Sequence, residues 1–325
     1  MNDQMKELIE KYGARLKEKE PMARWTTFKI GGPADWFFEA KTKEEFCDIV
    51  IFARRRKIPL FILGGGSNIL VGDAGIAGLV VKNSTGGMAI RGMKGAVHQG
   101  TSENIVFVEV ESGVIINKLV RFTIEEGLAG LEMHLGLPGT VGGAMYMNSK
   151  WTNPEGYVGD VVYQAIIILE GEQKSVPHSY FQFGYDWSNI QRTGDVVVSV
   201  VFALKRQPKE VLWDIANKSI AYRRDTQPTG VFSPGCTFRN ISHVQALSVS
   251  TPNGTTSAGF LVDHAGLKGR QVGNAQISPI HANFIVNLGG ATARDVVQLI
   301  EMARAEVKRR FGVTLEEEIV RVGEF

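Results

Sequence analysis

The stretch Leu63-Gly64-Gly65-Gly66-Ser67-Asn68 constrains this chain most, because three consecutive glycines stand between two apolar segments that predict strands, 59–63 and 69–71. Glycine has no Cβ, so such a loop permits positive φ angles and the close approach of another group. Its successive N–H groups form a concave site for an anion, to which Ser67 and Asn68 add polar side chains. Two interpretations stay open at this point: a plain hairpin turn and a phosphate-binding loop.

The loop departs from two widespread phosphate-binding motifs. No Lys-Ser or Lys-Thr pair follows the glycines, as a Walker loop requires, and no helix is predicted directly after them, as a dinucleotide-binding G-x-G-x-x-G motif requires. A phosphate cradle between two strands therefore remains as the ligand-binding alternative to a turn.

A second glycine-rich stretch covers residues 136–148, with Gly136, Gly139, Gly142 and Gly143 among other small residues. Taken alone, it predicts a tight loop that enters a short helix. Two separate stretches that both permit close backbone approach favour a shared ligand over two unrelated turns.

Composition places the chain among ordinary globular proteins. Its 325 residues predict two or three domains, and 44% hydrophobic and 22% charged residues are typical of that class. A net charge of +2 gives no reason to expect nucleic acid or a membrane as partner. The two cysteines, Cys47 and Cys236, are far apart in sequence and suit a reducing compartment, and residues 1–8 are too charged for a secretory signal. We expect a cytoplasmic protein.

Periodicity and capping signals predict a mixed order of helices and strands. The helices are expected over 4–18, 42–56, 114–127, 208–224, 257–265 and 292–312. The strands are expected over 35–40, 59–63, 69–71, 76–81, 105–110, 160–170, 195–204, 278–287 and 319–322. Residues 84–103 are rich in glycine and polar residues and predict a surface excursion with a poorly defined strand.

These pieces in this order resemble the MurB family, the FAD-dependent UDP-N-acetylenolpyruvoylglucosamine reductases, in their shorter type II form. The motifs that carry the resemblance are residues 27–34, 63–68, 136–148, 235–240, 265–269, 281–287 and 318–323. The resemblance implies an α+β fold with FAD-binding domains of the vanillyl-alcohol-oxidase type. It also implies a first FAD-binding subdomain at 1–83, a second at 84–206 joined by a strand from 315–325, and a substrate-binding domain at 207–314.

The resemblance further implies noncovalent FAD, held through both glycine-rich stretches, and NADPH as reductant. The expected cofactor-binding residues are Gly64, Gly65, Gly66, Ser67, Asn68, Gly136, Gly139, Thr140, Gly142, Gly143, Ala144, Asn148 and Arg223. For Arg223 the alternative is a cation that compensates the dipole at a helix end. No metal site is expected.

The resemblance assigns catalysis to two positions. Cys236 stands where the family usually has the serine that protonates the substrate, and a thiol with a free pKa of ~8.5 is mostly protonated at neutral pH; the alternative is a small buried hydrophobic residue. Glu318 matches the second catalytic carboxylate, although Glu316 and Glu317 are adjacent candidates. Arg239 and Asn240 are expected to contact substrate, with a salt-bridged surface as the alternative.

Two departures from the family concern the substrate side. Where the family has Tyr-Arg-x-Ser, this chain has Asp186, a carboxylate in place of the arginine that faces the enolpyruvyl group. Arg192 is the nearest cation in sequence. Residues 150–159 also form a longer connection than usual, whose role the sequence does not define.

We therefore expect an enzyme that reduces UDP-N-acetylglucosamine enolpyruvate to UDP-N-acetylmuramate, with FAD delivering hydride to C3 and Cys236 a proton to C2. This reaction belongs to peptidoglycan synthesis, and so to cell wall biogenesis, cell shape and cell division. A monomer that binds only small molecules is expected. Two alternatives stay open: a related flavoenzyme acting on another nucleotide sugar or carboxylate, and a flavin-binding protein that has lost catalysis.

Overall fold

The computed structural model describes residues 3–98, 101–153 and 155–325. Residues 99–100 of the expected surface excursion and residue 154 of the longer connection lie outside this range. The chain forms two compact units, which we describe separately. The first unit comprises residues 1–17, 36–65 and 78–223, and the second comprises residues 18–35, 66–77 and 224–325.

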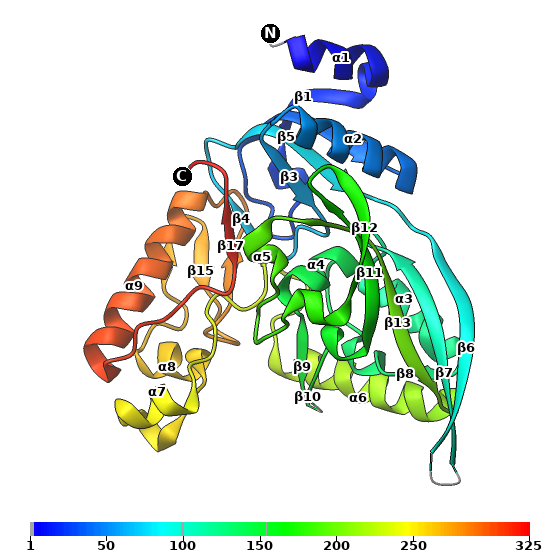
Figure 1. The fold of residues 1–325 in the computed structure, drawn as a ribbon. Helices are drawn as coiled ribbons and strands as arrows, with labels where there is room; N and C mark the ends of the chain where they lie inside the picture. The colour runs from blue at the N-terminus through cyan, green and yellow to red at the C-terminus, as the bar shows by residue number, and fades with distance from the viewer. Residues whose placement is uncertain (1–2, 99–100, 154) are drawn as a thin grey trace. The chain divides into compact units, whose positions relative to one another are not determined.

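The first unit holds most of the described strands (Figure 1). Its helices are α1 (Asp3–Tyr12), α2 (Lys43–Arg55), α3 (Ile116–Glu125), α4 (Val141–Met147), α5 (Ile190–Thr193) and α6 (Lys209–Thr226). Its strands are β2 (Pro33–Ala40), β3 (Leu60–Leu63), β5 (Ile76–Asn83), β6 (Met88–His98), β7 (Thr101–Glu111), β8 (Leu128–Ala129), β9 (Lys150–Thr152), β10 (Glu155–Tyr157), β11 (Val162–Leu169), β12 (Glu172–Pro177) and β13 (Val196–Arg206).

The larger sheet has the order β12-β11-β13-β7-β6, with β8 paired to β13. Neighbouring strands are antiparallel, and Val110 and Val108 of β7 lie opposite Val200 and Phe202 of β13. These side chains are buried with apolar residues of α3, α4 and α6, because alternate residues of a strand face the same side. The sheet and these helices enclose the main core of the unit.

The predicted excursion at 84–103 was wrong, because β6 and β7 form a long antiparallel pair. Strand β6 lies at the edge of its sheet and carries glycines, Arg91 and Lys94. Charges on an edge strand are a common protection against pairing with another chain, and they hide the alternation that predicts a strand.

The smaller sheet has the order β1-β2-β5-β3, where β1 covers Leu16–Pro21. Strands β3 and β5 are parallel, with Leu63 opposite Lys82. The glycine loop follows β3, whereas the next strand, β4 (Ile69–Val71), pairs with β17 (Val320–Val322) in another sheet. The loop is therefore not a hairpin turn, and that interpretation was wrong.

Local capping explains where helix α2 begins, whereas the first helix ends earlier than predicted. The Thr42 hydroxyl accepts a hydrogen bond of 3.2 Å from the Glu45 N–H, as a helix N-cap does. The predicted helix over 4–18 stops at Tyr12, because Gly13 takes a φ of 54° and the chain continues as β1. The longer helix had been predicted from the sequence pattern of residues 4–18 alone.

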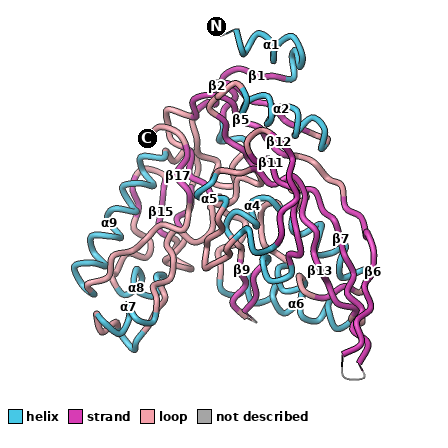
Figure 2. The backbone as a smooth tube through the Cα atoms, viewed as in Figure 1, coloured by secondary structure: helices cyan, strands magenta, loops and turns pink. Residues whose placement is uncertain are grey.

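The second unit is built around α9 and a small sheet (Figure 2). Its further elements are α7 (His243–Ser248), α8 (Ala258–His264), β14 (Gln271–Val272), β15 (Ala275–Ile277), β16 (Ile285–Asn287), α9 (Ala293–Phe311) and β17. The predicted strand over 278–287 is thus only three residues long. Apolar residues of α8, α9, β15 and β16 form the core of the unit.

Helix α9 begins and ends where the sequence predicted. Thr292 and Asp295 form a capping box, and Gly312 ends the helix in the left-handed region at a φ of 69°. The Asp73 carboxylate also accepts hydrogen bonds from the first-turn N–H groups of Ala293 and Arg294. A carboxylate at this end is favourable for the helix dipole.

The final strand has a different neighbour from the one expected. Strand β17 is parallel to β4, with Arg321 opposite Leu70, and both strands belong to the second unit. The sequence had joined residues 315–325 to the range 84–206. The division into three functional domains stays a prediction, because the two compact units follow other boundaries.

Candidate active site

In the first unit, the two glycine-rich stretches lie against each other. A Cβ on Gly64 would lie 2.5 Å from Oγ1 of Thr140, and one on Gly65 would lie 2.6 Å from the Cα atom of Gly139. Side chains at these positions would force the loops apart. Glycine is therefore required here for the approach of two protein segments, and the two stretches form one local structure.

This contact leaves backbone donors available. Within the described residues, the N–H groups of Gly65, Gly139 and Thr140 donate to no acceptor. Backbone N–H groups are normally paired unless they face water or a ligand. We call Gly64, Gly65, Gly139 and Thr140 the glycine cradle; its free donors fit an anionic group such as a phosphate.

The rest of the second stretch forms helix α4 and its ends. Thr140 accepts a hydrogen bond of 3.4 Å from the Gly143 N–H, and the Gly142 N–H donates to the Ser112 carbonyl at 2.8 Å. Ala144 is buried in the core. Asn148 follows the helix with a φ of 46°, and its amide bonds Gly184 and Gly159. Cofactor contacts by these residues stay predictions.

Arg223 packs against the start of the second stretch. A Cβ on Gly136 would lie 2.9 Å from Cδ of Arg223, and the Arg223 guanidinium lies 3.9 Å from the ring centre of Trp151. Trp151 belongs to β9, in the longer connection whose role the sequence left undefined, and β9 pairs with β10. This hairpin therefore holds Arg223 by a cation–π contact.

His134 lies in the same region and is fully buried. Within the described residues, neither of its ring nitrogens has a hydrogen-bond partner. Burial, followed by the positive charge of Arg223, lowers the pKa of His134 to about 4. The ring is neutral at physiological pH.

In the second unit, the third glycine of the loop serves a protein contact. Gly66 has a φ of 63°, and a Cβ there would lie 2.3 Å from the carbonyl oxygen of Trp25. Its carbonyl accepts the Thr27 N–H at 3.0 Å. Gly66 thus joins the loop to the 27–34 motif, and cofactor contacts by Gly66 and Ser67 stay predictions.

Cys236 lies on an extended segment between two others. It forms an antiparallel bridge with Phe284, and the neighbouring Thr237 carbonyl accepts the Glu318 N–H at 2.8 Å. The structure therefore brings the backbones of Cys236 and Glu318 within one residue of each other. The Cys236 thiol is half-buried and forms no disulfide, whereas burial raises the pKa of the core thiol Cys47 to about 11.

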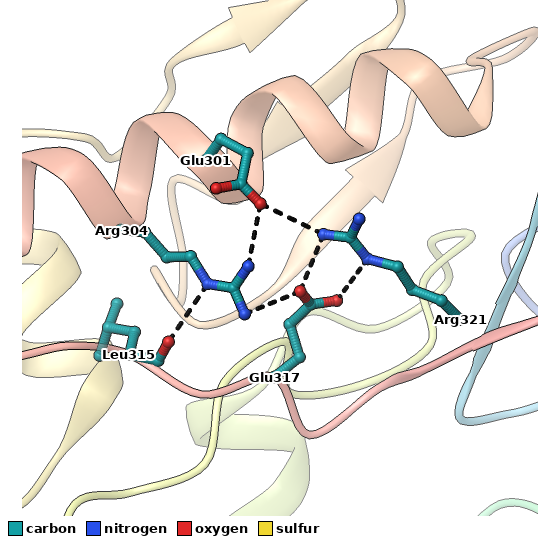
Figure 3. Close-up of polar contacts among 5 residues, drawn as sticks. All are labelled: Glu301, Arg304, Leu315, Glu317 and Arg321. Atoms are coloured by element: carbon teal, nitrogen blue, oxygen red, sulfur yellow. Dashed lines mark hydrogen bonds and ion pairs between the residues drawn. The ribbon is translucent and has the colours of Figure 1, made fainter. Parts of the chain in front are cut away.

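Glu317, the middle one of three consecutive glutamates, belongs to a network of polar contacts (Figure 3). The Glu317 carboxylate pairs with Arg304 at 2.9 Å and with Arg321 at 2.8 Å, and its side chain is only 14% exposed. Glu316 is exposed. Glu317 is therefore engaged in an ion-pair network that holds this segment.

The network in Figure 3 ties this segment to helix α9, which supplies Glu301 and Arg304. Arg304 also donates to the Leu315 carbonyl at 3.2 Å and pairs with Glu301 at 2.9 Å. Hydrogen bonding to Glu317 raises the pKa of Arg321, so this group stays charged. Arg321 thus stabilises the segment that carries Glu318.

Arg239 and Asn240 continue the Cys236 segment. The Arg239 N–H donates to the Glu316 carbonyl at 2.9 Å. The Asn240 side chain accepts the first-turn N–H of α8 from Ala258 at 3.1 Å. Both residues are therefore near the Cys236–Glu318 pair in the backbone, and their substrate contacts stay predictions.

Asp186 is buried in the first unit with a φ of 49°. Its neighbour Tyr185 lies under the ammonium of Lys150, which is 4.1 Å from the ring centre. Arg192 has another partner: its Nη2 and Nε donate to Oδ1 of Asn189 at 2.9 and 3.3 Å. Lys150 of the β9–β10 hairpin thus lies beside Tyr185, the residue that precedes Asp186.

Comparisons with known proteins assign the chain to a family. Residues 34–172 match the FAD binding domain, and residues 227–322 match the C-terminal domain of UDP-N-acetylenolpyruvoylglucosamine reductase. UDP-N-acetylenolpyruvoylglucosamine reductase 2 of Symbiobacterium thermophilum is 36% identical over 98% of this chain and 96% of its own length. The chain belongs to the UDP-N-acetylenolpyruvoylglucosamine reductase family. The relative from Desulforamulus reducens is also 36% identical, over 95% of this chain and 94% of its own.

The reductase fold is confirmed by a solved structure. The crystal structure of MurB from Thermus caldophilus has a TM-score of 0.75 and 31% sequence identity, and it covers 95% of this chain and 99% of its own. The predicted α+β, FAD-binding fold class is therefore right. Of the helices described, none is long and apolar enough to cross a membrane. No group of three metal-ligating side chains occurs among the described residues.

Two sets of hydrogen bonds near the candidate site residues were not predicted from the sequence. Lys82 donates to the Gly64 carbonyl, and Asn283 bonds both the N–H and the carbonyl of Phe238. The Lys82 contact could have been suspected, because this lysine directly follows the apolar strand predicted over 76–81. Asn283 lies in the 281–287 motif, but nothing in the sequence pairs it with the Cys236 segment.

Proposed function

We propose that this protein reduces UDP-N-acetylglucosamine enolpyruvate to UDP-N-acetylmuramate with NADPH. The observation that carries the proposal is the hydrogen bond between Thr237 and Glu318, which joins the segments that carry the Cys236 thiol and the Glu318 carboxylate. Family membership over nearly the whole chain supports the substrate class.

The residues of the first unit fit FAD. Two glycine-rich loops meet, and their free N–H groups suit a diphosphate. Gly64, Gly65, Gly139 and Thr140 would hold that part of the cofactor. Arg223, positioned by Trp151, would lie beside the second stretch. When bound, FAD accepts hydride from NADPH and supplies it to a substrate carbon.

The protein's own contribution is to donate a proton and to position the groups that react. Cys236 would donate its Sγ proton to C2 of the enolpyruvyl group, as a general acid does. Its half-buried position keeps the thiol accessible, unlike Cys47. Glu318, held by the Thr237 carbonyl and the α9 network, would assist this protonation through its carboxylate.

One observation favours a second candidate function. Asp186 places a buried carboxylate where the family has an arginine, and a carboxylate repels the carboxylate of an enolpyruvyl substrate. A reductase that acts on a different nucleotide sugar or carboxylate is therefore the alternative. The Lys150 ammonium beside Tyr185 supports the enolpyruvyl substrate instead, because it adds a positive charge to this region.

The identity of the product tests these functions. Purified protein with FAD and NADPH is incubated with UDP-N-acetylglucosamine enolpyruvate, and the product is examined by mass spectrometry. A gain of two hydrogens with matching NADPH consumption supports the proposal. NADPH oxidation without this product favours the second function, and no oxidation by any acceptor favours loss of catalysis.

A role in peptidoglycan synthesis carries further proposals. The enzyme would act in the cytoplasm, where NADPH and nucleotide sugars are available, and it would support cell wall biogenesis, cell shape and cell division. A monomer would suffice, because the proposed residues come from one chain.

A further inference from the structure

Lys82 stands at the end of strand β5, beside the glycine cradle. Its ammonium donates a hydrogen bond to the Gly64 carbonyl, and Lys82 lies opposite Leu63, the last residue of the parallel strand β3. Ligands of sheets with parallel strands commonly bind beyond the carboxyl ends of those strands. The lysine is therefore placed where the loop begins.

The charge of Lys82 is incompletely compensated within the described residues. It forms no ion pair with a described carboxylate, and Glu39 acts on it only at longer range. Ser84 donates to that carboxylate at 2.8 Å. Burial lowers the pKa of Lys82, which means that its environment disfavours the charged form. Buried charges in proteins are usually paired.

The hydrogen-bond donors next to Lys82 also favour an anionic ligand. Gly64, whose carbonyl Lys82 holds, contacts Thr140, and Gly65 contacts Gly139. Three backbone N–H groups of the cradle have no acceptor in the described structure. An ammonium with two further donors and several free N–H groups together form a site for a multiply charged anion.

We propose that Lys82 binds the diphosphate of FAD and is the charged member of the glycine cradle. The inference rests on the proposed use of the cradle for FAD. Lys82 has two functions in this arrangement: it holds the Gly64 carbonyl and so the shape of the loop, and it neutralises a phosphate oxygen. The bound diphosphate in turn compensates the partly buried ammonium.

Binding of FAD to apoprotein, measured by quenching of flavin fluorescence, tests the proposal. Lys82→Gln should weaken FAD binding about ten- to a hundredfold, the scale of one charge-assisted hydrogen bond, and should reduce the salt dependence of binding. Lys82→Arg should keep most of the affinity. Lys43→Gln is the matched control, because Lys43 is 30% exposed and pairs with Glu109 at 3.6 Å, away from the cradle.

ADP and adenosine identify the part of FAD involved. As competitors of FAD, ADP should lose affinity in Lys82→Gln, whereas adenosine should not. Equal FAD affinity in Lys82→Gln and wild type would overturn the proposal. Gly65→Val distinguishes the role of the glycine cradle from that of Lys82. If Gly65→Val abolishes FAD binding while Lys82→Gln has no effect, the cradle binds FAD but Lys82 does not. If Gly65→Val keeps full affinity for FAD, the proposed binding of FAD by the glycine cradle is wrong.

A structure of the FAD-bound protein decides the matter even if Lys82 variants do not fold. Nζ of Lys82 should lie within ~3.2 Å of a phosphate oxygen, the range of a hydrogen bond. A diphosphate bound elsewhere, with Lys82 bonded to Gly64 alone, would contradict the proposal.

Discussion

The side-chain amide of Asn68 donates a hydrogen bond of 3.1 Å to the carbonyl of Glu318, and the Asn68 carbonyl accepts the Val320 N–H at 2.9 Å. The last residue of the glycine motif thus holds the segment that carries the candidate catalytic carboxylate. A residue expected to bind the cofactor therefore also positions Glu318.

Asn68→Ala should lower kcat about tenfold and leave KM nearly unchanged, because one hydrogen bond that fixes Glu318 is lost. Asn68→Ser, which keeps a donor, should recover part of the loss. Flavin content is measured on each variant. Lower kcat at unchanged flavin content supports positioning of Glu318, whereas loss of flavin would show that Asn68 acts mainly on the cofactor.

Glu317→Gln should affect mainly the stability of the protein, whereas Glu318→Gln should affect mainly catalysis. Glu317→Gln removes the carboxylate that joins Arg304 and Arg321, and should lower the free energy of unfolding by about 1–2 kcal/mol. Glu318→Gln should instead slow the substrate half-reaction by ~10²–10⁴. Urea unfolding and stopped-flow kinetics measure the two effects. A large catalytic loss in Glu317→Gln, together with a normal catalytic rate in Glu318→Gln, would show that Glu317 is the catalytic carboxylate.

The sequence predicted features with local signals well. Thr292, Asp295 and Gly312 lie within or next to the helix they delimit, and the structure confirms them. Non-local features were missed. Glu316, Glu317 and Glu318 look alike in sequence, and contacts with Arg304, Arg321 and the Thr237 carbonyl distinguish them in the structure.

The same reason explains the glycine loop. Its approach to Gly139 and Thr140 joins segments that are far apart in sequence, and the position of Lys82 depends on the register of the parallel strands β3 and β5. Strand β6 was missed because edge-strand charges hide its alternation. Motif order gave the family, while individual roles required the contacts.

Lys150, not Arg192, should supply the charge that compensates for Asp186. Lys150→Ala should lower kcat on the order of 10²-fold, the scale of losing one preorganised charge, because its ammonium lies beside Tyr185. Arg192→Ala should have little effect, since its guanidinium bonds Asn189. Steady-state kinetics at equal flavin content test both. A loss in Arg192→Ala alone would return the role to Arg192.

His134 should make stability depend on pH. Its pKa is about 4 in the folded protein and ~6.5 when unfolded, so the unfolded state gains a proton first as pH falls. The free energy of unfolding should therefore decrease between pH 6.5 and 4, by on the order of 3 kcal/mol in total.

His134→Phe should remove this part of the pH dependence. The test is urea unfolding of both proteins at several pH values, with the exposed His243→Gln as control. Parallel stability curves for wild type and His134→Phe would show that His134 does not titrate in this range.

The central claim is tested by following the reoxidation of NADPH-reduced, FAD-bound protein after anaerobic mixing with UDP-N-acetylglucosamine enolpyruvate. Wild type should regain its flavin absorbance rapidly. Cys236→Ala should be reduced by NADPH at a normal rate but reoxidised ~10²–10⁴ times more slowly, as expected for loss of a general acid, and Cys236→Ser should recover most of the rate. Absence of reoxidation in the wild type at saturating substrate would contradict the proposed function, and an equal loss of both half-reactions in Cys236→Ala would contradict the role of the thiol.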